Sequence, residues 1–192
     1  MYRTALWAAV FDALAAAQVQ AADPPDSVVE LPTVQVIGTT PLPGLGVPLK
    51  DVPANVQTFG AREIDRQRWP TLGDFMLNNA GSVTTNAAQG NPYQPDIYFR
   101  GFAASPVLGT PQGLSVFLDG VRVNESFGDV VNWDLIPRAA IARVDLMPGS
   151  NPVFGLNTLG GALSIQTKNG RQFPGASIEA SGGSFGRSEV NF

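Results

Sequence analysis

Two short segments have the spacing of catalytic or phosphate-binding motifs. Residues 182–186 read GGSFG, which fits the Gly-x-Ser-x-Gly pattern of a nucleophile elbow, and residues 155–160 read GLNTLG, with the glycine spacing of a phosphate loop. A nucleophilic serine needs a base, and the sequence has no histidine. A phosphate loop needs Lys and Ser or Thr where this chain has Gly161 and Ala162. We therefore expect no enzyme.

The composition removes further kinds of chemistry. The chain has 192 residues without cysteine or histidine, which excludes disulfides, thiolate sites and the usual zinc ligand. Its formal net charge is −4, so it lacks the basic surface that binds nucleic acid or anionic lipid. We expect no metal site, no cofactor and no nucleic-acid partner.

The segment 33–38, TVQVIG, has the pattern of an exposed strand. Val34 and Val36 alternate with Thr33 and Gln35 within a proline-rich stretch of residues 22–50. A strand on a flexible arm can add itself to the edge of a partner's sheet, where backbone hydrogen bonds supply the affinity. The alternative is a linker strand without a partner.

The N-terminus has the features of a secretory signal peptide. Arg3 precedes an apolar stretch that ends in small residues, with a cleavage site before Ala22. The alternative is a buried amphipathic helix. We expect an exported protein whose residues 1–21 are removed.

Between residues 52 and 170 the patterns alternate between strands and short helices. We expect strands at 54–59, 96–101, 114–124 (a hairpin about Asp119-Gly120), 141–147 and 161–168, helices at 61–68 and 72–79, and loops at 80–95, 102–113 and 125–134. Thr71 and Asp74 resemble a capping box before the second helix. The fold class is α+β, a small mixed β-sheet with short helices.

The last segment differs in pattern from the rest. Residues 175–192 alternate small or apolar residues with polar ones in two arms, as in strands of an outer-membrane β-barrel. A surface hairpin is the alternative reading. We expect residues 171–192 to be the start of a β-barrel, one or two strands that are unfinished in this chain.

In order, these segments resemble the plug domain of TonB-dependent outer-membrane receptors. The resemblance rests on TVQVIG, VPANVQTFGAREID, FRGF, VFLDGVRVN and IPRAAIARVDLMPGSNPVFGLNTLGGALSIQTK. It implies that 22–51 is a flexible arm, that 33–38 is a TonB box and that 52–170 is the plug.

The resemblance also implies sites. The TonB C-terminal domain would bind Thr33, Val34, Gln35, Val36, Ile37 and Gly38, and Arg100 and Arg143 would contact barrel carboxylates. Ligand contacts would come from the loops 82–95, 102–113 and 125–134, with the aromatic candidates Tyr93, Phe102, Phe127 and Trp133. Packing within the loops is the alternative role for these rings, and a surface charge at a strand end is the alternative for Arg100.

The implied function is energised uptake of a small-molecule or metal-chelate nutrient, such as a siderophore–iron complex, across the cell outer membrane. The barrel domain would be absent from this chain, so the chain would not transport alone. A soluble periplasmic α+β binding or interaction module is the alternative.

Overall fold

The computed structural model describes residues 34, 36–37, 47–87, 90–150 and 152–191. Among these residues the α-helices are α2 (Ala61–Gln67) and α3 (Leu72–Asn79), and single turns of 3-10 helix form η1 (Leu49–Asp51), η2 (Trp133–Leu135), η3 (Arg138–Ala140), η4 (Pro152–Phe154) and η5 (Ser184–Gly186). Within these ranges no helix combines the length and the apolar character needed to cross a membrane.

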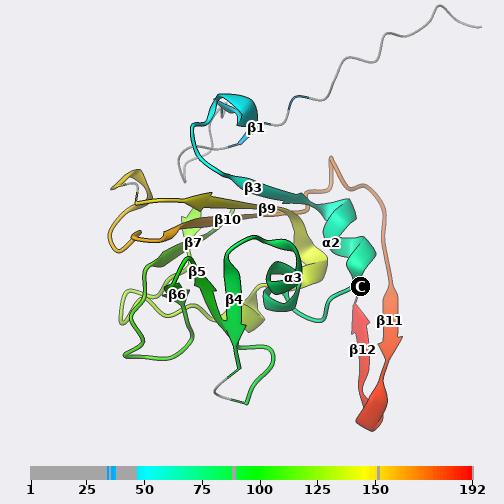
Figure 1. Cartoon of the computed structure of the whole chain (residues 1–192). Helices are drawn as coiled ribbons and strands as arrows, with labels where there is room; N and C mark the ends of the chain where they lie inside the picture. Colours follow the sequence, from blue (N-terminus) through cyan, green and yellow to red (C-terminus); the bar gives the residue numbers. More distant parts are fainter. Residues whose placement is uncertain (1–33, 35, 38–46, 88–89, 151, 192) are drawn as a thin grey trace, which may run out of the picture. The chain divides into compact units, whose positions relative to one another are not determined.

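The central sheet has five strands in the order β3-β9-β10-β7-β8 (Figure 1). They are β3 (Gln57–Gly60), β7 (Leu114–Leu118), β8 (Val121–Arg122), β9 (Ile141–Pro148) and β10 (Gly161–Thr167). Strand β10 runs parallel to β7 and antiparallel to β9, so the sheet is mixed. The predicted α+β class with a small mixed sheet is confirmed.

A second sheet corrects two predicted loops. It consists of β4 (Val83–Asn86), β5 (Asp96–Phe99) and β6 (Phe102–Ala104), each antiparallel to its neighbour. Strand β4 lies in the segment 80–95 and β6 in 102–113, both of which the sequence predicted as loops. Both strands are short and consist mostly of small residues. They form because β5 supplies backbone partners on both of its edges.

The helices follow their local signals. The hydroxyl of Thr71 accepts a hydrogen bond from the Asp74 backbone N–H at 3.1 Å, so the predicted N-cap of α3 is confirmed. Helix α2 ends where Arg68 adopts a left-handed conformation with φ +51°. The side-chain amides of Gln67 and Asn79, the last residues of α2 and α3, exchange hydrogen bonds of 2.7 and 2.9 Å and so join the two helices.

The core lies between the two sheets and the helices. Val144 and Leu146 of β9 share it with Leu163 and Ile165 of β10, as the alternation of β10 predicts. Phe75 of α3 packs edge-to-face on Phe59 of β3 at a centroid distance of 5.4 Å. This contact joins the helices to the sheet.

The bend between β9 and β10 depends on Gly161. Its φ is +152°, and a Cβ at this position would lie 2.2 Å from the backbone oxygen of Met147. The bend therefore needs a glycine so that β10 can pair closely with the end of β9.

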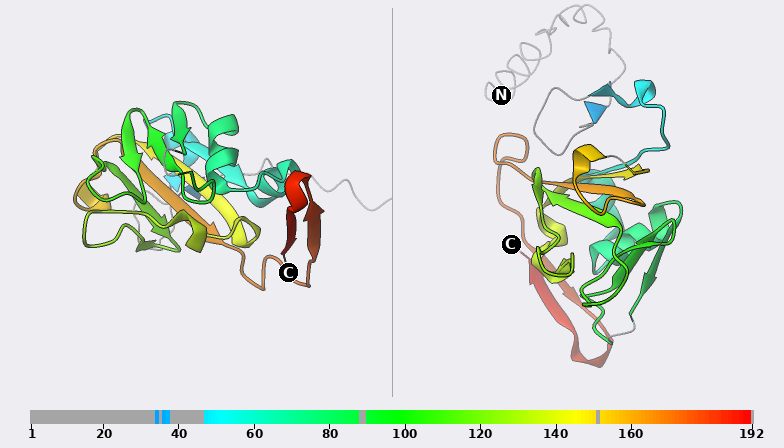
Figure 2. Two further views of the ribbon diagram at one scale, coloured as in Figure 1. Left: turned by 90° about the horizontal axis from the view of Figure 1, so that it is seen from below. Right: turned by 90° about the vertical axis from the view of Figure 1, so that its left-hand side faces the viewer.

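Two small hairpins complete the described chain (Figure 2). Strand β1 (Val36–Ile37) pairs with β2 (Val47–Pro48), and β11 (Glu179–Gly182) pairs with β12 (Ser188–Asn191), both antiparallel. The second pair, here called the terminal hairpin, has the strand pairing that the alternation in residues 175–192 predicts.

Candidate functional site

Three loops meet at one end of the second sheet. The backbone N–H of Val131 donates to the Ser105 carbonyl at 3.0 Å, and that of Trp133 donates to the Gln94 side chain at 3.2 Å. Ser105 also donates from its hydroxyl to the buried Asp96. Residues 90–95, 105–112 and 125–134 are therefore neighbours, and we call them the loop end.

Asp129 ties the loop 125–134 to two other segments. Its carboxylate accepts from Arg122 at 3.1 Å and from the Asn157 amide at 2.9 Å. The residue has φ +52°, a conformation that Asp tolerates better than most side chains. One side chain thus connects β8, the loop 125–134 and the bend before β10.

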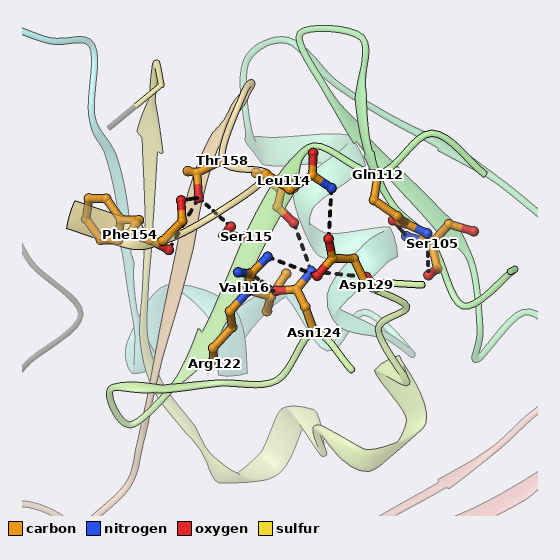
Figure 3. A network of polar contacts seen from close by, with 12 residues as sticks. Ser105, Gln112, Leu114, Ser115, Val116, Arg122, Asn124, Asp129, Phe154 and Thr158 are labelled. Carbon is orange, nitrogen blue, oxygen red and sulfur yellow. Dashed lines mark hydrogen bonds and ion pairs between the residues drawn. The ribbon is translucent and has the colours of Figure 1, made fainter. Parts of the chain in front are cut away.

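Asn124 fastens the same loop to β7 (Figure 3). Its amide oxygen accepts from the Val116 N–H at 2.7 Å, and its amide nitrogen donates to the carbonyls of Leu114 and Asp129, both at 3.2 Å. A buried bond of 2.6 Å between the hydroxyls of Ser115 and Thr158 continues the polar contacts across to the bend. Since these groups are paired, the base of the loop 125–134 is positioned by side chains.

The four aromatic ligand candidates lie in different surroundings. Phe127 and Tyr93 are exposed. Phe102 is half-buried and packs where a Cβ on Gly113 would stand, 2.6 Å from its Cδ1. Trp133 is only 6 % exposed, and its indole N–H donates to the Ala104 carbonyl at 3.2 Å. Trp133 therefore packs in the core, and Phe127 and Tyr93 are the two candidates whose rings are exposed.

The two arginines predicted to contact a barrel differ in their partners. Arg100 is exposed, and no ion pair joins its guanidinium to any residue that the structure describes. Arg143 pairs with the buried Asp145 at 2.8 Å, while its Nη2 is buried and has no hydrogen-bond partner among the described residues. Arg100 therefore retains donors at the surface, whereas the unpaired nitrogen of Arg143 lies inside the protein.

The sequence reasoning missed Arg138. Its guanidinium pairs at 3.1 Å with Glu179 of β11, and the Arg138 side chain is 8 % exposed. The second oxygen of Glu179 lies 3.8 Å from Arg68 at the end of α2. The only sequence signal was a glutamate within the alternating strand, which names no partner. These contacts tie the terminal hairpin to the folded residues 52–170.

The segment 33–38 lies partly outside the described residues. Thr33, Gln35 and Gly38 are not described, and Val34 and Val36 are exposed. Val36 and Ile37 pair with β2. The TonB box stays a prediction. Groups of three or more side chains that could hold a metal ion do not occur in the described residues.

Comparison with known proteins identifies related sequences. The profile of the TonB-dependent Receptor Plug Domain matches residues 48–162. The vitamin B12 transporter BtuB of Vibrio cholerae serotype O1 (strain ATCC 39541 / Classical Ogawa 395 / O395) is 24% identical over 140 residues, which cover 72% of this chain and 21% of that protein. The Rhizobactin receptor of Rhizobium meliloti (strain 1021) is 33% identical over 69 residues, 35% of this chain and 9% of that protein.

A solved structure has the same fold. The siderophore receptor PiuA from Acinetobacter baumannii aligns with a TM-score of 0.52 and 21% identity, over 75% of this chain and 18% of that one. The chain thus spans about a fifth of the length of the vitamin B12 transporters it matches, 21% for the Vibrio cholerae protein. Because the profile matches more than half of its residues, the chain belongs to the TonB-dependent receptor plug domain family, a family of outer-membrane receptors.

Proposed function

We propose that this chain is the plug portion of an outer-membrane receptor for energised uptake of a nutrient such as a siderophore–iron complex. The observation that carries the proposal is the loop end, where hydrogen bonds join three separate loops, one of which carries the exposed Phe127. A recognition surface needs side chains from several loops held on a rigid scaffold. Side-chain bonds from Asn124 and Asp129 supply that scaffold here.

The related proteins support this class of function. Their names describe a vitamin B12 transporter, a rhizobactin receptor and a siderophore receptor. Family membership also favours a receptor plug over a soluble periplasmic binding module and over an enzyme. The cargo of this chain, and its inability to transport without a barrel, are parts of the proposal.

The barrel would meet the plug at Arg100 and Arg143. Arg100 is exposed and the Arg143 side chain is 24% exposed, so both arginines keep surface for a carboxylate from a surrounding barrel wall. Residues 171–192 would be the start of this barrel, and Glu179 would hold that start against Arg138.

TonB would bind the segment 33–38 on the arm 22–51. Val34 and Val36 have exposed side chains, and within the described residues β1 has a neighbouring strand, β2, on one edge only, so its other edge is open to a new sheet partner. Backbone hydrogen bonds would carry the affinity, so the side chains matter less than the N–H donors.

Proline substitutions test this role. Val34→Pro and Val36→Pro each remove a backbone donor and should weaken binding to a TonB C-terminal domain, measured by calorimetry, by roughly 2- to 12-fold, the value of one hydrogen bond. Val34→Ala and Val36→Ala keep the N–H and serve as controls with little expected change. Unchanged dissociation constants in both proline variants would reject the TonB box.

A further inference from the structure

We propose that the loop end accepts an apolar ligand that carries no negative charge. This inference rests on the proposed function, since it assigns the ligand class of the same surface. It concerns the part of the binding surface that this chain contributes.

Apolar side chains gather on two of the loops. Phe127 is 78 % exposed and Leu108 is 56 % exposed. The Leu108 side chain lies against Gly128, where an added Cβ would stand 2.4 Å from its Cδ2. Leu108 and Phe127 therefore belong to one region of the surface, and burying them against a ligand would favour an apolar molecule.

The charge on the loop end has one sign. The segments 82–95, 102–113 and 125–134 contain no lysine or arginine, whereas the last of them carries Glu125, Asp129 and Asp134. Arg122 reaches this region, but it is paired with Asp129 at 3.1 Å. An anionic ligand would therefore find carboxylates and no unpaired cation on these loops.

The nearest unpaired arginine of the second sheet lies at its opposite end. Asp96 begins β5 beside the loop end, and Arg100 follows the last residue of the same strand. At ~3.3 Å per residue these four steps span ~13 Å, which exceeds the Debye length of ~8 Å at physiological ionic strength. Arg100 therefore does not compensate the carboxylates of the loop end.

These features together select against anions. An anion placed on Phe127 would lose water without gaining a cationic partner. A neutral molecule avoids that loss, and a cation gains from both the aromatic face and the carboxylates. The ligand class is thus a neutral or cationic molecule with an apolar face.

Two dyes with the same ring system test the inference on the chain itself. N-phenyl-1-naphthylamine is uncharged, and 8-anilino-1-naphthalenesulfonate adds one sulfonate. We expect the uncharged dye to bind about fourfold more tightly in fluorescence titrations at low ionic strength, the discrimination that two carboxylates at ~10 Å produce in water without screening by salt. Equal or tighter binding of the sulfonate, or no binding of either dye, would overturn the proposal.

Matched variants locate the binding. Phe127→Ser should reduce binding of the uncharged dye, whereas Phe185→Ser, which removes a still more exposed ring on the terminal hairpin, should not. The double variant Glu125→Gln, Asp134→Asn keeps an acceptor for Asn132 and Gln94 and should strengthen only sulfonate binding. Loss of dye binding in Phe185→Ser alone would place the dye elsewhere and refute the assignment.

The same samples are tested for TonB binding, which separates two kinds of failure. Normal TonB binding with the wrong dye preference would refute the ligand class and leave the proposed function standing. If the chain does not bind TonB but shows the expected dye preference, the result counts against the proposed function and leaves the surface assignment intact.

Discussion

Substitution of Asp129 measures how firmly the loop 125–134 is held. The carboxylate accepts two hydrogen bonds, from Arg122 at 3.1 Å and Asn157 at 2.9 Å, and the backbone has φ +52°. Three variants separate these contributions. Asp129→Ala removes the bonds and places a methyl group in a left-handed conformation, Asp129→Gly removes the bonds alone, and Asp129→Asn keeps one acceptor.

The expected losses follow from exposure and backbone geometry. The Arg122 and Asp129 side chains are 26% and 31% exposed, so each bond contributes about 1 kcal/mol, less than a buried charged bond. Alanine in the left-handed region costs about 1 kcal/mol more. We expect the free energy of unfolding to fall by about 3 kcal/mol for Asp129→Ala, about 2 for Asp129→Gly and about 1 for Asp129→Asn.

Urea denaturation gives the free energies, and limited chymotrypsin digestion at Phe127 reports on the loop itself. Cleavage at Phe127 should become faster in the same order as the loss of stability, because the loop opens more often. If Asp129→Ala and Asp129→Gly both keep wild-type stability and cleavage rate, the carboxylate does not hold the loop and the reasoning fails. Equal losses in the two variants would refute only the backbone contribution.

Two further predictions concern the bend and the isolated chain. Gly161→Ala should lower the free energy of unfolding by at least about 2 kcal/mol because its Cβ would meet the Met147 oxygen, while Gly170→Ala, with open space around it, should be close to wild type in the same urea experiment. Purified residues 22–192 should form no channels in planar bilayers, because membrane barrels have at least about eight strands; reproducible conductance steps would show that the chain assembles a pore.

The strands that could be predicted are those in which burial of one face or a tight turn produces a recognisable residue pattern. Strand β10 alternates because one face packs in the core, and the β7–β8 turn has positive φ at Asp119 and Gly120, which an Asp-Gly pair permits. Strands β4 and β6 show no such pattern. They form because β5 lies between them and pairs with both: β6 begins three positions after β5 ends, and β4 ends ten positions before β5 begins.

The candidate site was predictable as a set of loops but not as a set of contacts. Trp133 and Phe127 look alike in sequence, yet one ring is buried beneath the Ala104 carbonyl and the other is exposed. The bond between Asn157 and Asp129 joins residues 28 positions apart, and nothing in either segment specifies it.

The contacts of the terminal hairpin differ in kind from those of residues 52–170. The two sheets and α3 share an apolar core, whereas Glu179 contacts Arg138 and Arg68 through charges and is one-third exposed. Ion pairs with that degree of solvent exposure contribute little to stability, so they orient a strand more than they fix it. Exposed Ile178 and Val190 lie on the same hairpin and retain apolar surface for a further neighbour. A plug that must stay folded while its surroundings change would need this division, with hydrophobic packing inside it and separable charges at its boundary.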